Sequence, residues 1–346
     1  MATTVREPGG SGQTTTQPTP GGRRGASRLL GGKSLEALAL PIAWLAVIVI
    51  FGILRPDTFL TGANFSTILA SQAVLVVVTL ALIIPLTAGD YDLSVAAVVG
   101  LSANLIAILN VDRGWPVGLA ILAALAAGAA VGFVNGALVV LLGIESLIVT
   151  LGMGTFVTGL VLWFGSSNTV SGISSALVNP VIVWRFAGVP FEFYYGLALC
   201  FLLWYVFRYT PVGRRLLVVG RGREVARLSG MRVGNIRWGS LTISATIAAF
   251  GGVLYAGTTG AAGPSSGVEL LLPAFAAAFL GATTISPGRF NPWGTVIAVY
   301  FLVTGITGLQ LLGAESYVQN LFYGAALILA VAFSQIVRRR QQRHAR

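Results

Sequence analysis

The sequence predicts an all-α integral membrane protein with about ten transmembrane helices and with both termini in the cytoplasm. Composition is the first reason: 55% of the residues are hydrophobic and only 10% are charged, whereas about a quarter of the residues of a soluble domain are charged. Charge distribution is the second reason. Eight arginines and a single acid, Glu224, lie between Arg208 and Trp238, with apolar sequence on both sides. This loop must lie in water on one side of a membrane.

Apolar segments of spanning length follow one another through the chain. A bilayer core about 30 Å thick requires about 20 helical residues to cross it, and apolar residues surround each segment instead of forming one stripe, as in membrane helices. The ten expected spans are residues 37–54, 65–86, 93–110, 116–141, 146–165, 191–207, 240–259, 270–284, 293–312 and 318–337. The third and the eighth of these are short and interrupted.

Polar ends flank the transmembrane domain, which we place at residues 37–337. Residues 1–36 are rich in Thr, Pro, Gly and Arg and have too little apolar surface to fold alone, so we predict a disordered cytoplasmic tail. The Gly-Lys-Ser sequence ending at Ser34 is not a nucleotide site, because a phosphate-binding loop requires glycine where Ser27 stands. Residues 338–346 form a short basic cytoplasmic tail.

Loop charge predicts the orientation, because cytoplasmic loops are enriched in Lys and Arg. With the N-terminus inside and ten crossings, all of the 22 basic residues except Arg55, Arg113 and Arg185 lie on the cytoplasmic side. An odd number of spans would place one basic terminus on the wrong side. We therefore expect residues 208–239 to form a cytoplasmic loop and the protein to be a multi-pass protein of the cell membrane.

Several kinds of site are excluded by composition. The net charge of +11 comes from loops that flank apolar runs, so nucleic acid is not an expected partner, although anionic membrane lipid is. Cys200 is the single cysteine and lies in an apolar run, which excludes a disulfide framework. The single histidine, His344, lies in the basic tail, so we expect no metal centre. We also expect no cofactor in this chain.

Two polar, glycine-containing stretches interrupt apolar runs, at residues 87–94 and 281–292. Irregular backbone at membrane depth survives only where protein or a water-filled cavity satisfies it, so broken segments in both halves of a chain are typical of a transporter's working region. The sequence therefore predicts a solute pathway. Its candidate residues are Thr87, Asp90, Asp92, Ser94, Asn135 and Glu269.

The acids of this set have alternative interpretations. Asp90 and Asp92 could form a general acid and base pair, but no nucleophile or metal cluster accompanies them. Capping of the third span, or a role at an interface, is the ordinary explanation, and contact with a polar solute is the alternative. Glu269 begins another span, where an intramembrane acid is functional by default, but it lies near the outer surface.

Three glycines repeat every fourth residue in the fourth span, at Gly128, Gly132 and Gly136. Small residues at this spacing let two helices approach closely, so we predict that this face packs against another helix. The adjacent Asn135 can hydrogen-bond across that interface or toward a solute, and the sequence leaves both open.

Residues 166–190 are rich in Ser, Asn and Gly and fall on the outer face. We interpret this segment as a solvated connection with a short re-entrant helix. A docking surface for an external partner is the alternative.

Within the loop of residues 208–239, a stretch of about two helical turns places apolar residues on one face and two arginines on another. Ser229-Gly230 supplies a stop. Such a helix lies on anionic lipid or enters a groove on a partner protein. Its shortness favours the partner, because two turns are marginally stable as a helix in water.

Three motifs together resemble a known family. They are T-A-G-D-Y-D-L-S-V at 87–95, G-F-V-N-G-A-L-V-V-L-L-G-I-E-S-L-I-V-T-L-G-M at 132–153, and the segment from T-P-V-G-R-R to E-V-A-R-L-S-G-M at 210–231. In this order and spacing they resemble the permease subunits of ATP-binding-cassette importers of ribose and other monosaccharides, within the branched-chain amino-acid permease superfamily. Asp90 and Tyr91 stand where that family commonly has Gly and Ile.

The resemblance implies a partner arrangement. Two permease subunits, identical or paralogous, would enclose the path of a monosaccharide or similar small polar solute, with a solute-binding protein outside. Two cytoplasmic ATPase subunits would bind ATP and Mg, so this chain would not itself be an enzyme. The short helix of the loop then resembles a coupling helix that enters the ATPase. Its residues are Arg223, Glu224, Arg227, Leu228, Ser229 and Gly230.

An ion-coupled secondary transporter is the alternative function. It would require intramembrane acids or histidines that relay protons or bind sodium, and Asp90, Asp92 and Glu269 are the only candidates. A membrane-embedded enzyme lacks a nucleophile or metal set. Pro273 and the missing double glycine in the eighth span depart from the family pattern and bear on the identity of the solute.

Overall fold

The computed structural model describes residues 2–4, 26–165 and 168–343. Residues 36–346 form one compact unit, and residues 1–35 are assigned to another. In its first half the chain forms α1 (Ala26–Leu54), α2 (Pro56–Phe59), α3 (Gly62–Ser71), α4 (Ala73–Ala88), α5 (Val95–Ala107), the π-helical turn η1 (Ile108–Asp112), α6 (Val117–Leu141), α7 (Ser146–Phe164), β1 (Val170–Ser171), α8 (Ser175–Val178), η2 (Asn179–Val183), β2 (Arg185–Phe186) and β3 (Val189–Pro190). In its second half it forms α9 (Phe191–Tyr209), α10 (Pro211–Arg221), α11 (Arg223–Leu228), α12 (Val233–Thr259), β4 (Ala261–Ala262), the 3-10 turn η3 (Val268–Leu270), α13 (Leu271–Gly281), α14 (Pro292–Leu311) and α15 (Ser316–Arg343).

The architecture is that of an all-α membrane protein, and the four strands found among the described residues are two residues long each. By length and composition, seven helical segments of the described chain can cross a membrane: Gly62–Ala88, Val95–Asp112, Val117–Leu141, Ser146–Phe164, Phe191–Tyr209, Val233–Thr259 and Pro292–Leu311. The other three expected spans are apolar helices of 10–17 residues, at Leu38–Leu54, Val268–Gly281 and Ser316–Ala332.

Two predicted boundaries differ from the structure. Helix α1 begins at Ala26, inside the segment predicted to be a disordered tail up to residue 36, of which residues 5–25 lie outside the described residues. Helix α12 begins at Val233, inside the predicted loop 208–239, and α10 and α11 make most of that loop helical. The basic side chain of Arg237 therefore belongs to a helix, where an acid neutralises it.

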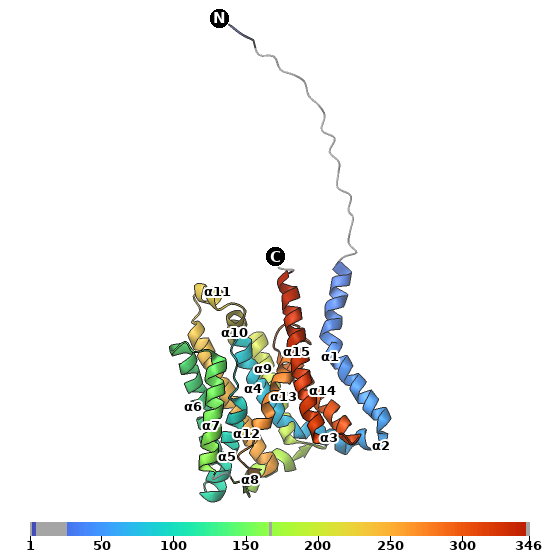
Figure 1. Cartoon of the computed structure of the whole chain (residues 1–346), viewed down its shortest axis with the longest axis vertical. Coiled ribbons are helices and arrows are strands. Elements are labelled where there is room, and N and C mark those ends of the chain that lie inside the picture. The colour runs from blue at the N-terminus through green and yellow to red at the C-terminus, as the bar shows by residue number, and fades with distance from the viewer. Residues whose placement is uncertain (1, 5–25, 166–167, 344–346) are drawn as a thin grey trace. The chain divides into compact units, whose positions relative to one another are not determined.

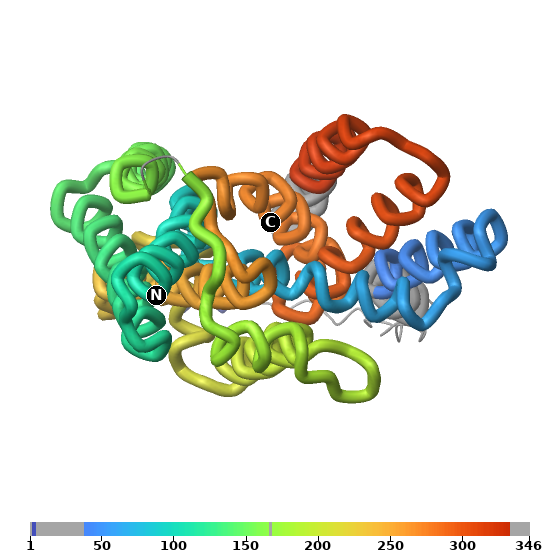
Figure 2. Tube along the Cα trace, turned by 90° about the horizontal axis from the view of Figure 1, so that it is seen from below, coloured from blue at the N-terminus to red at the C-terminus, as the bar shows by residue number. Residues whose placement is uncertain are grey.

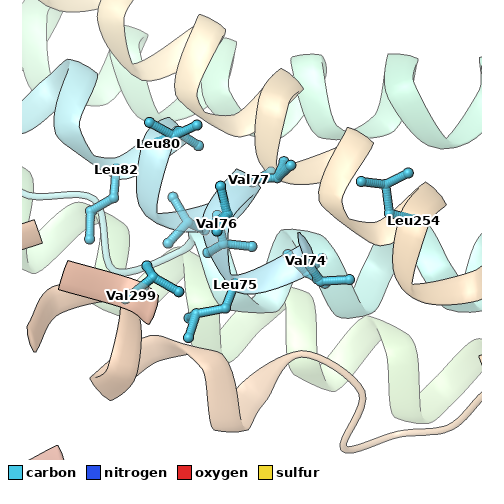
Figure 3. Close-up of a cluster of buried hydrophobic side chains, with 14 of the residues drawn as sticks. Val74, Leu75, Val76, Val77, Leu80, Leu82, Leu254 and Val299 are labelled. Carbon is cyan, nitrogen blue, oxygen red and sulfur yellow. The ribbon is translucent and has the colours of Figure 1, made fainter. Parts of the chain in front are cut away.

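Helix α4 forms the centre of the bundle, because every residue from Ala73 to Ala88 is buried. Its β-branched and leucine side chains fill the space between α12 and α14. Figure 3 shows Val76 and Leu75 of α4 in the same cluster as Leu254 of α12 and Val299 of α14. Such a helix, apolar on all sides, is typical of a position surrounded by other helices.

Helix α12 packs against α6 with almost no side chain between the backbones. Gly128, Gly132 and Gly136 all face it, and a Cβ built on Gly132 would lie 2.6 Å from the carbonyl oxygen of Leu241 and 2.7 Å from Cβ of Ala245. Gly136 faces the indole of Trp238. Because helices in lipid associate through close van der Waals contact, this small-residue face fixes the separation of α6 and α12.

Figure 1 shows α10, α11 and the C-terminal end of α15 at one end of the bundle, and α2, α3 and α8 at the other. The connection from α7 to α9 crosses that second end, as Figure 2 shows in yellow-green. From residue 168 on it packs against the bundle: β1 pairs antiparallel with β4, with Val170 opposite Ala262, and Leu177 and Val181 are buried. Its short helix is α8.

The α6–α12 contact gives a first prediction. Replacing Gly132 by Val inserts three carbons where even one has no room, which costs about 1–3 kcal/mol of stability and lowers the melting temperature in detergent by about 1–4 °C. Gly118→Val is the matched control, because Gly118 lies in the same helix and a Cβ built on it would have no atom within 4 Å. Equal melting temperatures for the two variants would contradict this packing.

Candidate functional site

The polar stretch between α4 and α5 lies beside the arginine-rich helices. Helix α4 ends at Gly89, whose φ of 82° is a left-handed conformation that glycine adopts without strain. The chain then runs without regular structure through Asp90 and Asp92 to the start of α5. Both carboxylates are fully buried, with 0% exposure. A buried charge is stable only when it is paired and hydrogen-bonded, so the partners of these two acids define the site.

Two arginines neutralise Asp90. Arg237 of α12 donates from Nε to Oδ2 at 2.8 Å and from Nη2 to Oδ1 at 2.7 Å. Arg223, the first residue of α11, donates from Nη2 to Oδ1 at 2.9 Å and to the carbonyl oxygen of Gly89 at 2.7 Å. These are the only ion pairs among the residues that the structure describes. They join the α4–α5 turn to two elements more than 130 residues away in sequence.

Asp92 has a different role, since its carboxylate accepts hydrogen bonds at the N-terminus of α5. Oδ1 accepts the backbone N–H of Ser94 at 3.1 Å and its hydroxyl at 2.6 Å. Asn135 of α6 donates from Nδ2 to the same hydroxyl oxygen at 2.9 Å. Burial raises the pKa of Asp92, and the hydrogen bonds from Ser94 oppose that shift. Asp92 thus organises the N-terminus of α5 and links it to α6.

Helix α7 holds the same turn from a third side. The backbone N–H of Tyr91 donates to Oγ of Ser146 at 3.1 Å, and the N–H of Leu93 donates to Oγ1 of Thr150 at 3.0 Å. These hydroxyls satisfy backbone groups that no regular structure satisfies, as buried peptide groups require. The turn is therefore fixed to α6, α7, α11 and α12 together.

A cavity of about 500 Å³ opens beside these ion pairs. The α4–α5 turn, the α6–α7 connection and the α10–α11 junction form its walls. Three arginines line it, Arg221, Arg223 and Arg237, together with the acids Asp90 and Glu145. The lining is polar and charged, which suits water and charged side chains better than an apolar ligand.

Residues 64–331 match the family described as branched-chain amino acid transport system / permease component. The chain belongs to this family. The resemblance predicted from the three motifs is thereby confirmed, and the protein is a multi-pass membrane permease.

Relatives of the permease cover most of its length. The D-allose transport system permease protein AlsC of Escherichia coli is 30% identical over 85% of this chain and 90% of the relative. The ribose import permease protein RbsC of Bacillus subtilis is 30% identical over 82% and 88%. The fructose import permease protein FrcC of Rhizobium meliloti is 29% identical over 87% and 86%.

The structure of the permease brings most of the predicted pathway residues together. Asp90, Asp92, Ser94 and Asn135 form the connected group described above, and Thr87 is buried one turn earlier, donating to the carbonyl oxygen of Ile83 at 2.6 Å. All of these side chains are buried rather than exposed to a path. The predicted Glu269 is elsewhere, exposed in η3.

The second polar stretch, residues 281–292, ends near the first. Burial and the positive charge of Arg221, the last residue of α10, lower the pKa of Arg289. Asn291 organises it by accepting the N–H of Gly294 at 2.7 Å and donating to the carbonyl oxygen of Gly281 at 3.2 Å. The two interrupted stretches of the permease thus lie at the same end of the bundle.

Helix α11 contains most of the predicted coupling residues and projects from the permease. Ala226 is its only buried residue, whereas the side chains of Val225 and Leu228 are 66% and 87% exposed. Glu224, Arg227, Ser229 and Gly230 are also exposed. Gly230 ends the segment with a φ of 77°.

Sequence reasoning missed two features of the permease. The pairing of Arg237 with Asp90 joins positions 147 residues apart and has no local pattern. Glu192 in the first turn of α9 is 1% exposed, and its Oε2 accepts the hydroxyl of Thr258 at 2.5 Å. An acid at the start of an apolar helix was the available signal for Glu192.

The Asp92 group gives a second prediction. Asp92→Ala removes two hydrogen bonds at the start of α5 and leaves the hydroxyl of Ser94 without its acceptor, so uptake of solute falls while the transport complex still assembles. Uptake into cells and co-purification of the complex measure the two effects. Asp57→Ala, at an exposed acid of α2, is the control. Unchanged uptake would leave Asp92 as a helix cap without a role in transport.

Proposed function

We propose that this chain forms the translocation path for a monosaccharide, or a similar small polar solute, in an ATP-binding-cassette importer. The observation that carries the proposal is the near full-length similarity to permeases whose names specify D-allose, ribose and fructose. A transport role also agrees with the fold, in which two interrupted polar stretches lie within a bundle of apolar helices.

The proposed membrane orientation has ten spans and both termini in the cytoplasm. It is supported by the loop charges, since α10 and α11, which carry most of the arginines of the loop, lie together at one end of the bundle (Figure 1). The end with the α7–α9 connection then faces outward. There Trp184, just before β2, and Phe186 of β2 are 57% and 64% exposed, and these would meet the solute-binding protein.

In this orientation α11 is the coupling helix of the importer. Its exposed Val225 and Leu228 present an apolar face to a groove on a cytoplasmic ATPase subunit, and Arg227 adds a cation beside that face. Importers with such permeases work with ATP-binding and solute-binding partners. ATP and Mg would be bound by the ATPase subunits, and a second permease subunit, identical or paralogous, would complete the path.

The proposed transport activity predicts ATP-driven sugar uptake. Proteoliposomes that hold the complete complex, with ATP inside facing the ATPase subunits, should accumulate one labelled monosaccharide from a panel that includes allose, ribose and fructose. A non-hydrolysable ATP analogue should abolish the uptake. Uptake that needs no ATP but follows an imposed proton or sodium gradient would overturn the proposal in favour of a secondary transporter.

The coupling role predicts that reversing a charge on α11 separates the permease from its ATPase. Arg227→Glu should reduce co-purification of the ATPase subunit and abolish uptake, because an exposed side chain at the interface is changed without loss of an internal contact. Arg214→Glu is the matched control, since Arg214 is an exposed arginine of α10. An intact complex with normal transport after Arg227→Glu would rule out this interface.

A further inference from the structure

We propose that Asp90 is a positioning residue of the transport cycle. Through its ion pair with Arg223, a movement of α11 is transmitted to the turn between α4 and α5. The proposal rests on the function assigned above to α11. Its basis is the pair of arginines on one buried carboxylate, one from α11 and one from α12.

The two arginines hold Asp90 unequally. Arg237 is 16% exposed and binds both carboxylate oxygens, through Nε and Nη2. Arg223 is 43% exposed and uses the single nitrogen Nη2 for both Asp90 and the carbonyl oxygen of Gly89. A bidentate, shielded pair is the stronger one. Arg237 can therefore keep Asp90 neutralised when Arg223 departs, so that release of Arg223 does not leave a buried charge unpaired.

The attachments of α11 allow it to move relative to α10. Helix α10 is fixed, because its Gly220 packs against the carbonyl oxygen of Thr87 so closely that a Cβ would overlap it. Helix α11 is joined to it through the one extended residue Gly222 and buries only Ala226. The side chain of Arg223 is thus a principal attachment of α11 to the bundle, and the adjoining cavity of about 500 Å³ gives that side chain space into which it can swing.

The other side of Asp90 leads into the membrane helices. The turn that carries it is bonded to Ser146 and Thr150 of α7, and through Asp92 and Ser94 to Asn135 of α6. When Arg223 forms or loses its contact with Asp90, the turn that carries Asp90 is affected, and this turn is hydrogen-bonded to α5, α6 and α7. Two sites that bias one such element are energetically coupled.

The test uses the complete complex with its ATPase subunits and solute-binding protein in proteoliposomes. Asp90→Asn and Arg223→Gln should lower the stimulation of ATP hydrolysis by loaded binding protein by about tenfold, measured against each variant's own basal rate and within the usual range of coupling between sites. More ATP should be hydrolysed per sugar imported. Asp90→Glu, which keeps the charge, should restore part of the stimulation.

Two further variants separate coupling from stability. Arg221→Gln changes an arginine of the same cavity that does not pair with Asp90, and should behave like the wild type. Arg237→Gln removes the shielded partner and should lower the melting temperature more than Arg223→Gln does. The double variant Asp90→Asn/Arg223→Gln should lose no more stimulation than Asp90→Asn alone, because Asp90→Asn already removes the ion pair with Arg223.

The outcomes are distinct. Normal stimulation and normal ATP per sugar in Arg223→Gln would overturn the proposal, and this variant leaves Asp90 paired with Arg237 even if Asp90→Asn fails to fold. Equal losses in Arg221→Gln and Arg223→Gln would also overturn it, because a general effect of cavity charge would then explain both. A wild-type complex without ATP-driven uptake would instead contradict the proposed function of the protein.

Discussion

The close approach of α12 to its neighbours is the contact on which the rest of the bundle depends. Between helices in lipid there is little hydrophobic driving force, so association comes from direct packing of backbones and small side chains. Gly128, Gly132 and Gly136 of α6 provide this on one side, and Gly252 of α12 provides it against Ser102 of α5. Larger residues at these positions would separate α12 from α5 and α6. The neighbouring α4, which is buried along its whole length, would then be exposed to its surroundings.

The same helix extends beyond the apolar bundle to the charged end of the protein. Because α12 is held along its length, Arg237 near its start is a fixed cation, and the turn before α5 can bury an acid against it. The exposed Arg223 then adds a second contact from a short helix with few other attachments. A rigid element and a weakly attached element thus share one carboxylate, and this shared contact is the basis of the coupling that we propose.

Much of this fold follows from sequence, because composition and small-residue spacing reflect local physics. The ten apolar segments, the glycine face of α6 and the helix at 223–228 are each set by residues close in the chain. The boundary of α12 did not follow, since a span is expected to stop before a charge such as Arg237 unless a distant acid neutralises it. The burial of Glu192 likewise depends on Thr258, from another helix.

The motif at 87–95 predicts Asp90 as a residue of the solute pathway, whereas the structure shows it paired with Arg223 and Arg237. An acid in a buried turn would be strongly destabilising without cations, and the shielded Arg237 would lack its partner without the acid. The acid and its arginines therefore depend on one another, and one of the two arginines, Arg223, belongs to α11. Asp92, Ser94 and Asn135 are fully buried behind this pair. The group that links the turn to α6 is thus shielded from solvent on the inner side of the ion pairs.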